Sequence, residues 1–435
     1  MKTARNHNGA QGGNETAWSA QARSIWASPA WAPVFAHLEA IEPWVLAQQI
    51  AVTAVAAPTH FEGLRAEWMV RTLGELGLPA QVDAAGNVLA ERPGAAAKRP
   101  LAALTAHLDT AFPPGTSVQP ARRQGRVWAP GISDNGCGLA ALLAVARTLH
   151  DCRLRTRHPM LFVANVGEEG EGDLKGMRHL FSPQNPVARR IGWTLVLDGP
   201  GTDQITTEAL PSLRLRIGIE GPGGHSWSDL GRASAAHAAA RVAAALLAQV
   251  RPEAGELGCN IGLVQSGSAV NAIAAEAQLK LDLRARQRSG IERLNQAVRR
   301  ALAMGLEQEN EAALSGSVRG QIETIGERPG GALPPDSPLL ALVRAVDSIL
   351  GIKATTQCAS TDANVPLSQA REALRLGAGG SAGGIHTLQE WFDPQGRMVA
   401  LQRILLVALV VAGAEPPSAA PGGIPRQSTS RGSRK

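Results

Sequence analysis

Short apolar segments alternate with segments of helical spacing along most of this chain, and this alternation restricts the fold more than any other feature. Residues 101–110 and 191–197 form strand-like apolar runs, and residues 138–152 between them have the apolar spacing of an amphipathic helix. Parallel strands need such crossover helices and are covered on both faces. The alternation therefore predicts the α/β class, with a largely parallel sheet between layers of helices.

The pattern changes at about residue 208 and returns at about residue 327. Between these points the order is strand, helix, strand, strand, helix, strand, which is typical of a small α+β, ferredoxin-like domain. The sequence thus predicts a discontinuous α/β domain with an α+β domain inserted in it. The expected boundaries are a larger domain of residues 26–207 and 327–414, an inserted domain of residues 208–326, and disordered tails at residues 1–25 and 415–435.

Charge and cysteine content exclude several classes of partner. The chain has a formal charge of +6, and its last eleven residues hold four positive charges and no acid. We expect a solvated tail and no nucleic-acid partner, because no aromatic side chains are interleaved with the basic ones. The longest apolar run, residues 404–414, is too short to span a bilayer, so no membrane partner is expected. Four widely spaced cysteines and a polar N-terminus without an apolar signal core predict a cytoplasmic protein.

His107 and Asp109 stand two positions apart at the end of the run 101–110, and side chains alternate faces along a strand, so both point to the same side. In open parallel sheets, ligands bind at the carboxyl ends of the strands. Other predicted strand ends and the loops after them carry further acids and a histidine: Asp134, Glu168, Glu169, Asp198 and His386. A single strand-end Asp is commonly a helix cap, but caps do not explain five such places in one topology.

These residue types suit a pair of divalent metal ions, with Zn²⁺, Co²⁺ and Mn²⁺ as the ions that bind such nitrogen and oxygen ligands. A bridging carboxylate can hold two ions about 3.5–4 Å apart, and the pair then activates a shared water molecule. Of the adjacent acids Glu168 and Glu169, one can bind metal while the other stays free as a general base.

Six motifs in order now carry a resemblance: HLDT, GISDNGCG, NVGEEGEGDLKG, VLDG, GGHS and IHTLQEW. They resemble the successive signatures of the M20 family of dinuclear zinc metallopeptidases, which includes peptidase T, carboxypeptidase G2, succinyl-diaminopimelate desuccinylase and acetylornithine deacetylase. The resemblance runs from about residue 40 to residue 412, with the inserted domain in its expected place. The segment STDANVPLSQ followed by GGIHTLQEW is most similar to the peptidase T-like branch.

The resemblance implies two metal ions per chain and a role for each strand-end residue. One ion would be held by His107, Asp134 and Asp198, and the other by Asp134, Glu169 and His386, with Asp134 bridging. Many family members have a second Asp where this chain has Asn135, and the family often has a cis peptide after the bridging Asp. We therefore expect a cis bond between Asp134 and Asn135.

The catalytic roles implied by the resemblance fall on three further residues. Glu168 would take a proton from the bridging water and return it to the leaving amine. Asp109 would accept a hydrogen bond from the ring of His107 and so fix its tautomer. His225, in the glycine-rich loop of the inserted domain, would stabilise the tetrahedral oxyanion when the domains close, often by reaching across a homodimer.

Two residues of the inserted domain match positions that bind substrate in the family, Asn271 and Arg284. Arg284 could clamp a substrate carboxylate with both of its terminal nitrogens. It could equally be a strand-edge arginine paired with Asp282, since exposed arginines often form such surface pairs.

Two other classes of function were weighed. Residues 379–383 match the G-x-S-x-G pattern of serine hydrolases, but the only later histidine, His386, belongs to the metal motif, which excludes that class. A non-catalytic metal-binding protein is disfavoured because Glu168 and every ligand are present. The sequence predicts a metallopeptidase that hydrolyses an amide bond in small peptides. An N-acyl-amino-acid amidohydrolase of the same family is the alternative, since fold and motifs do not separate the two.

Overall fold

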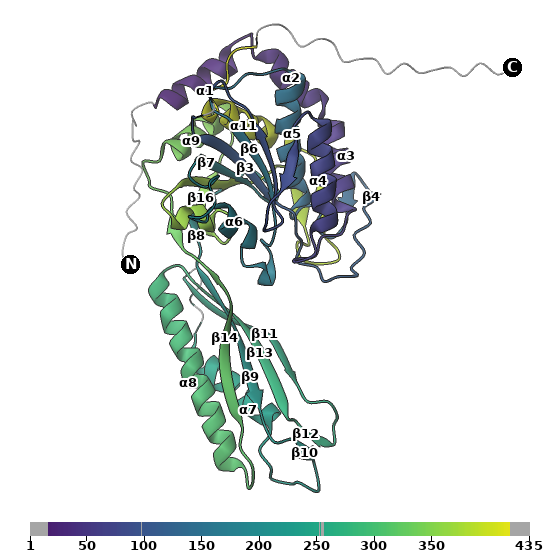
Figure 1. Ribbon diagram of the computed structural model, residues 1–435, viewed down its shortest axis with the longest axis vertical. Helices are drawn as coiled ribbons and strands as arrows, with labels where there is room; N and C mark the ends of the chain where they lie inside the picture. Colours follow the sequence, from purple (N-terminus) through teal and green to yellow (C-terminus); the bar gives the residue numbers. More distant parts are fainter. Residues whose placement is uncertain (1–15, 97, 252, 254–255, 418–435) are drawn as a thin grey trace, which may run out of the picture.

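The computed structural model describes residues 16–96, 98–251, 253 and 256–417, and shows a larger domain from which a second, elongated domain projects (Figure 1). The main sheet of the larger domain has the order β1-β2-β6-β3-β7-β17-β8-β15, with β16 also paired to β8. Its strands are β1 (Ala80–Val82), β2 (Val88–Arg92), β3 (Leu101–His107), β6 (Met160–Asn165), β7 (Ile191–Leu197), β8 (Gln204–Ala209), β15 (Gly331–Ala332), β16 (Thr355–Ala359) and β17 (Glu372–Leu376).

The centre of this sheet is parallel, as predicted: β3 pairs in parallel with β6 and β7, and β7 with β17. One edge is antiparallel, since β1 and β2 form a hairpin, and the other is mixed, since β8 pairs antiparallel with β17 and β15 but parallel with β16. A two-strand hairpin closes over a short turn, here around Gly86, without a crossover helix. The predicted α/β class is therefore confirmed, with a mixed rather than a wholly parallel sheet.

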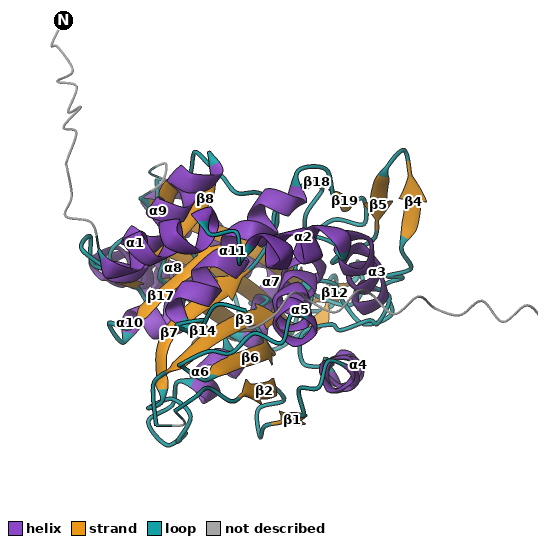
Figure 2. Ribbon diagram, turned by 90° about the horizontal axis from the view of Figure 1, so that it is seen from above, coloured by secondary structure: helices purple, strands orange, loops and turns teal. Residues whose placement is uncertain are grey.

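Helices cover both faces of the sheet, as Figure 2 shows. They are α1 (Ala17–Ala27), α2 (Ala32–Ala40), α3 (Glu42–Thr53), α4 (Gly63–Glu75), α5 (Gly136–Asp151), α6 (Lys175–Leu180), α9 (Pro338–Leu350), α10 (Asn364–Ser368) and α11 (Arg397–Val411), with a short 3-10 helix η1 (Gly170–Gly172). Every residue of β3 is buried. Ala102 and Leu104 join the core cluster of α5 and α11, whereas Leu101 and Ala103 join the cluster of α6, so successive side chains fill opposite layers. Among the described residues, no helix combines the length and apolar character needed to cross a bilayer.

A second, smaller sheet of the larger domain has the order β18-β19-β5-β4 and links distant parts of the chain. It consists of β4 (Ala121–Arg123), β5 (Arg126–Trp128), β18 (Ser381–Gly383) and β19 (Trp391–Asp393). Trp391 pairs with Trp128 across β19 and β5. This pairing brings the loop before α5 next to the segment that contains His386.

The inserted domain has the predicted order of elements. Its sheet, β11-β13-β9-β14, is antiparallel throughout and is packed against two helices. The elements are β9 (Ser212–Glu220), α7 (Ala235–Gln249), β11 (Leu257–Ser266), β13 (Glu276–Ala285), α8 (Arg288–Ala312) and β14 (Arg319–Arg328). The sequence did not indicate the small two-stranded sheet of β10 (Gly224–His225) and β12 (Ala272–Ile273) at its far end (Figure 1).

The expectation that residues 1–25 are disordered is wrong from residue 17 onward. Helix α1 begins after Thr16, whose hydroxyl caps the Ser19 N–H at 3.1 Å, and it buries Ala22 and Ile25. The ring of Trp18 meets that of Trp193 edge-on, with centroids 5.4 Å apart. The polar residues before Thr16 suggested that disorder continues to residue 25. The short amphipathic helix that follows them is stabilised by packing on the larger domain rather than by propensity. Residues 1–15 and 418–435, where the predicted tails fall, lie outside the described part of the chain.

The packing of α1 predicts a position-dependent cost for a charge on this helix. Ala22 is fully buried and Ala20 is exposed. Ala22→Asp should lower the free energy of unfolding by at least about 2 kcal/mol, because it buries an unpaired carboxylate. Ala20→Asp on the same helix should change it by less than about 0.5 kcal/mol. Urea unfolding of both variants tests this, and equal losses would show that α1 is not part of the folded core.

Candidate metal centre

Three neighbouring strands, in the order β6-β3-β7, deliver most of the predicted site residues to one edge of the sheet. His107 is the last residue of β3, and Asp198 directly follows β7. Glu168 and Glu169 follow β6 after a two-residue connection. Because these strands are parallel, their carboxyl ends meet at the same edge. Helix cover on both faces leaves these side chains buried or nearly so.

Asp134 lies between the two histidines, with one carboxylate oxygen toward each. Its Oδ1 is 3.0 Å from His107 Nε2, and its Oδ2 is 3.1 Å from His386 Nε2. His386 Nε2 is also 2.9 Å from Glu169 Oε1, and His107 Nε2 is 3.8 Å from Asp198 Oδ1. Ligand atoms of His107, Asp134 and Glu169 all lie within 4.8 Å of one another. The structure therefore brings all five predicted ligands together, with Asp134 in the central position that a bridging carboxylate needs.

The charges in this cluster also suit a cation. The carboxylates of Asp134 and Glu169 raise the pKa of His386 to about 11. Burial alone raises the pKa of Asp134, but hydrogen bonds from His107 and His386 hold it well below its usual range. Concentrated buried carboxylates need neutralisation by protons or metal ions. Nitrogen and oxygen donors in this arrangement are the set that Zn²⁺ and similar divalent ions bind.

Asp109 supports the site in two ways, of which the sequence indicated one. His107 Nδ1 faces Asp109, at 3.1 Å from its backbone carbonyl and 3.5 Å from its Oδ1, so Nε2 is left to face Asp134. The predicted orientation of the ring is therefore present, although the shorter contact is to the backbone. The Asp109 carboxylate also accepts hydrogen bonds from the backbone N–H groups of Glu168 and Glu169, at 2.9 and 2.8 Å. This second contact ties the Glu168–Glu169 loop to the end of β3.

Glu390 is a buried carboxylate that the sequence analysis missed. It accepts hydrogen bonds from Gly131 N at 2.7 Å, Ser133 N at 2.8 Å, Ser133 Oγ at 2.6 Å and Asp134 N at 3.1 Å. Burial raises its pKa, which these hydrogen bonds oppose. Glu390 thus fixes the backbone of the loop that carries Asp134. It lies in the IHTLQEW motif, where an acid between Gln389 and Trp391 was the available signal.

The peptide bond between Asp134 and Asn135 is cis, as expected. Asn135 begins α5, where its Oδ1 accepts from Gly138 N at 3.1 Å. Its Nδ2 donates to the Leu197 carbonyl at 2.9 Å, immediately before Asp198. An aspartate at this position could accept the first hydrogen bond but, when ionised, could not donate the second. The amide of Asn135 therefore links the loop of Asp134 to the end of β7.

The side chain of Glu168 is held by an arginine. Arg328 Nη1 donates to Glu168 Oε1 at 2.9 Å, and both side chains are almost completely buried. Burial raises the pKa of Glu168 well above its usual value, which the Arg328 charge opposes and Glu169 reinforces. Its position next to Glu169 fits the predicted division between a free acid and a ligand.

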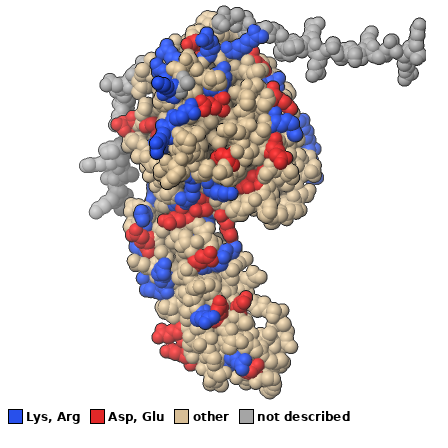
Figure 3. Space-filling model, viewed as in Figure 1, with Lys and Arg blue, Asp and Glu red and all other residues tan. Residues whose placement is uncertain are grey.

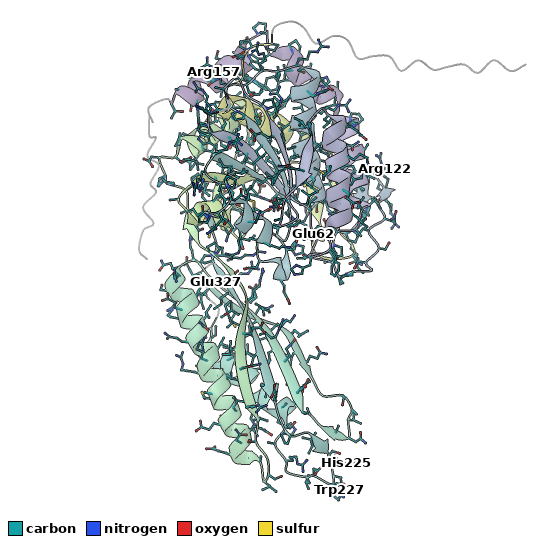
Figure 4. All side chains as sticks on the ribbon, in the orientation of Figure 1. Glu62, Arg122, Arg157, His225, Trp227 and Glu327 are labelled. Atoms are coloured by element: carbon teal, nitrogen blue, oxygen red, sulfur yellow. The ribbon has the colours of Figure 1, made fainter. Side chains whose placement is uncertain are left out.

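The structure does not bring the predicted residues of the inserted domain to this cluster. His225 lies on β10 at the far end of that domain, beside the exposed Trp227 (Figure 4). Asn271 is next to it in space, where its carbonyl accepts from Ser226 N at 3.0 Å. Arg284 Nε donates to Asp282 Oδ2 at 2.8 Å, so within one chain it forms the surface pair that was the alternative to substrate binding.

Comparisons with known proteins agree with this fold. The profile of the peptidase family M20/M25/M40 matches residues 103–409, and the chain belongs to that family. It is therefore a hydrolase of peptide or amide C–N bonds. No curated protein sequence matches the chain significantly.

Solved structures show the same fold at low sequence identity. An aminopeptidase PepT from Bacillus cereus is 18% identical with a TM-score of 0.64, covering 85% of this chain and 98% of that chain. A di-peptidase from Saccharomyces cerevisiae is 12% identical with a TM-score of 0.72, covering 88% and 98%. A hydantoinase/carbamoylase family amidase from Burkholderia ambifaria is 21% identical with a TM-score of 0.58, covering 88% and 98%. The fold, with its inserted domain, is thus shared by peptidases and amidases.

The contacts of Glu390 predict an effect on metal affinity without direct contact to metal. Glu390→Gln should weaken zinc binding by about 10–100-fold, because the loop of Asp134 loses charged acceptors for its N–H groups. The exposed Glu75→Gln on α4 serves as the control and should leave binding unchanged. Competition with a chromogenic zinc chelator measures both. Equal affinities in the two variants would remove Glu390 from the support of the site.

Proposed function

We propose that this protein is a dinuclear metal-dependent peptidase that cleaves small peptides, such as di- and tripeptides, in the manner of the peptidase T-like branch. The observation that carries the proposal is Asp134 between His107 and His386, with the unligated acid Glu168 beside the ligand Glu169. One metal ion is assigned to His107, Asp134 and Asp198, and the other to Asp134, Glu169 and His386. Zinc is the first candidate for both, with cobalt and manganese as alternatives.

The bound ions supply an activated water and a Lewis acid for the scissile carbonyl. Glu168 accepts the proton of that water and returns it to the leaving amine, which its raised pKa favours. Asp109 keeps His107 in the tautomer with Nε2 free, and holds the N–H groups of Glu168 and Glu169. The chain's own residues thus position the base and the ligands from the same strand end.

His225 is proposed to stabilise the oxyanion, with Asn271 and Arg284 binding substrate. Because His225 lies at the far end of the inserted domain (Figure 4), its role requires closure of that domain or a second copy of the chain. Arg284 pairs with Ser212 at the other end of the inserted sheet, near the larger domain. We therefore include a homodimer formed through the inserted domain in the proposal. The four free cysteines favour a cytoplasmic location, where thiols stay reduced.

An N-acyl amino acid is the second candidate substrate, cleaved by the same chemistry. The structural relatives described above include an aminopeptidase and a di-peptidase as well as an amidase. The motif STDANVPLSQ, which is similar to the peptidase T-like branch, favours the peptide.

The proposal predicts that Glu168 is essential for turnover but not for metal binding. Glu168→Gln should reduce kcat by at least about 10²–10⁴-fold, since a general base contributes that much. Metal content should remain at two ions per chain. The exposed Glu67→Gln on α4 is the control and should retain wild-type kcat. Retained activity in Glu168→Gln would contradict the mechanism.

Substrate and metal are tested on the wild-type protein. Metal content is measured by elemental analysis, and hydrolysis of di- and tripeptides and of N-acyl amino acids is followed before and after chelation. Chelator-sensitive cleavage of peptides supports the proposal. Cleavage of N-acyl amino acids alone moves the substrate to the second candidate, and no cleavage with two ions bound contradicts both.

A further inference from the structure

The junction between the two domains converges on one short loop, residues 168–173, which carries Glu168 and the ligand Glu169. Arg214 from β9 donates to the Gly170 carbonyl, and Lys280 from β13 pairs with Glu171. Glu327 N, from β14, donates to Asp173 Oδ1 at 2.9 Å. Figure 3 shows acidic and basic side chains gathered at this narrow junction. The inserted domain therefore rests on the same loop that supplies the candidate base.

The end of β14 is shaped to lie against this loop. The pairing of β14 with β9 shifts register between Thr324 and Gly326, which directs the following residues toward residue 173. A Cβ atom at Gly326 would lie 3.1 Å from Asp173 Oδ1 and 3.4 Å from Arg214 Cδ, so glycine permits the close approach. Arg178 of α6 adds a contact from the larger domain, with Nη2 3.1 Å from Asp173 Oδ2 and a hydrogen bond to the Glu327 carbonyl.

Arg328, the last residue of β14, reaches from this junction to Glu168. Its Nη1 donates to Glu168 Oε1 at 2.9 Å and to Ser360 Oγ at 3.0 Å, and its Nη2 donates to the Glu168 backbone carbonyl. Only 4% of Arg328 is exposed. Burial lowers its pKa, but Glu168, Glu169 and Asp362 raise it overall, so the guanidinium stays charged. One planar group thus fixes both the side chain and the backbone of Glu168.

The two oxygens of the Glu168 carboxylate differ in their hydrogen bonds. Oε1 is bound by Arg328, whereas Oε2 accepts no hydrogen bond from any described residue. A carboxylate held through one oxygen cannot rotate freely, and the other oxygen is left to accept a proton. A buried ion pair is seldom more stable than an apolar pair of similar volume, so stability alone does not account for this arrangement.

We infer that Arg328 is a positioning residue for the general base, and that it makes the orientation of Glu168 depend on where the inserted domain lies. The inference rests on the proposed function, in which Glu168 is the base. Arg328 belongs to the inserted domain's last strand, so a rotation of that domain moves the guanidinium and the carboxylate bound to it. Closure and alignment of the base are thereby coupled through one side chain.

The first test compares two arginines at the same junction. Arg328→Met removes the contacts to Glu168, whereas Arg178→Met removes contacts to Asp173 and Glu327 but none to Glu168. Arg328→Met should lower kcat by about 10²-fold or more, as expected when a reacting group loses its alignment, while KM changes by less than threefold. Arg178→Met should keep kcat within threefold. Equal losses of kcat in the two variants would overturn the inference.

Arg328→Lys and Arg328→Gly test whether the planar guanidinium group, and not only its charge, is needed. Lysine supplies the charge but not two fixed donors, so Arg328→Lys should fall between wild type and Arg328→Met. Guanidinium ion at low millimolar concentration should raise the kcat of Arg328→Gly at least tenfold, and an equal concentration of ammonium should not. Absence of rescue in a folded, metal-loaded Arg328→Gly protein would contradict positioning by the guanidinium group.

A measurement without metal or turnover separates this inference from the proposed function. Metal-free Arg328→Met, Glu168→Gln and the double variant are compared by thermal unfolding. Because the two side chains interact directly, the Tm loss of the double variant should be smaller than the sum of the single losses. Additive losses would overturn the pairing. If the Tm losses of the variants are coupled but the wild-type protein cleaves no amide, the pairing of Arg328 with Glu168 stands and the proposed function is wrong.

Discussion

The position of the Asp134 carboxylate is the constraint on which the rest of the site depends. Its two oxygens face two histidines that come from opposite ends of the sequence, His107 and His386. Asp134 is not on a regular element, so its position is fixed by its neighbours: Glu390 binds the N–H groups before it, and Asn135 ties the peptide after it to the end of β7. Each restraint replaces water as partner for a buried polar group, which would otherwise cost free energy.

Burial of this many ionisable groups at one sheet edge is helped by acids next to the cluster that have hydrogen-bond partners outside the set of candidate ligands. Asp109 receives two backbone N–H groups, and Asn165 at the end of β6 donates to Asp362 Oδ2 at 2.7 Å. Burial raises the pKa of Asp362 to about 7, the charges of Asp198 and Asp109 add to this shift, and His107 and Asn165 oppose it. A cation bound between the histidines and the carboxylates would relieve the same excess. Burying the charged side chains of the candidate metal site costs free energy, and the hydrogen bonds around them reduce that cost.

The candidate ligands His107, Glu169 and Asp198 were predictable from the sequence because they stand at or just after the ends of β3, β6 and β7, and parallel strands bring their carboxyl ends together whatever lies between them. His107 and Asp198 follow this rule directly. Glu390 and Arg328 could not be found in this way, since their partners lie 256 and 160 residues away along the chain and no local pattern marks a buried acceptor or donor. Helix α1 was missed because its stability comes from packing, and His225 is distant from the cluster because β10 lies at the far end of the inserted domain (Figure 4).

The loop of residues 168–173 has three roles: it carries the candidate metal ligand Glu169, it carries the candidate base Glu168, and it supports the inserted domain. Asp109 fixes its beginning from the sheet, and Asp173 fixes its end to β14. A loop restrained at both ends transmits displacement instead of absorbing it, because the intervening residues have little freedom left. Movement of the inserted domain, if it brings His225 to the site, should therefore also displace Glu168. The junction and the candidate base share this loop, and the contact of Arg328 with Glu168 is the one through which a substitution at the junction should reach turnover.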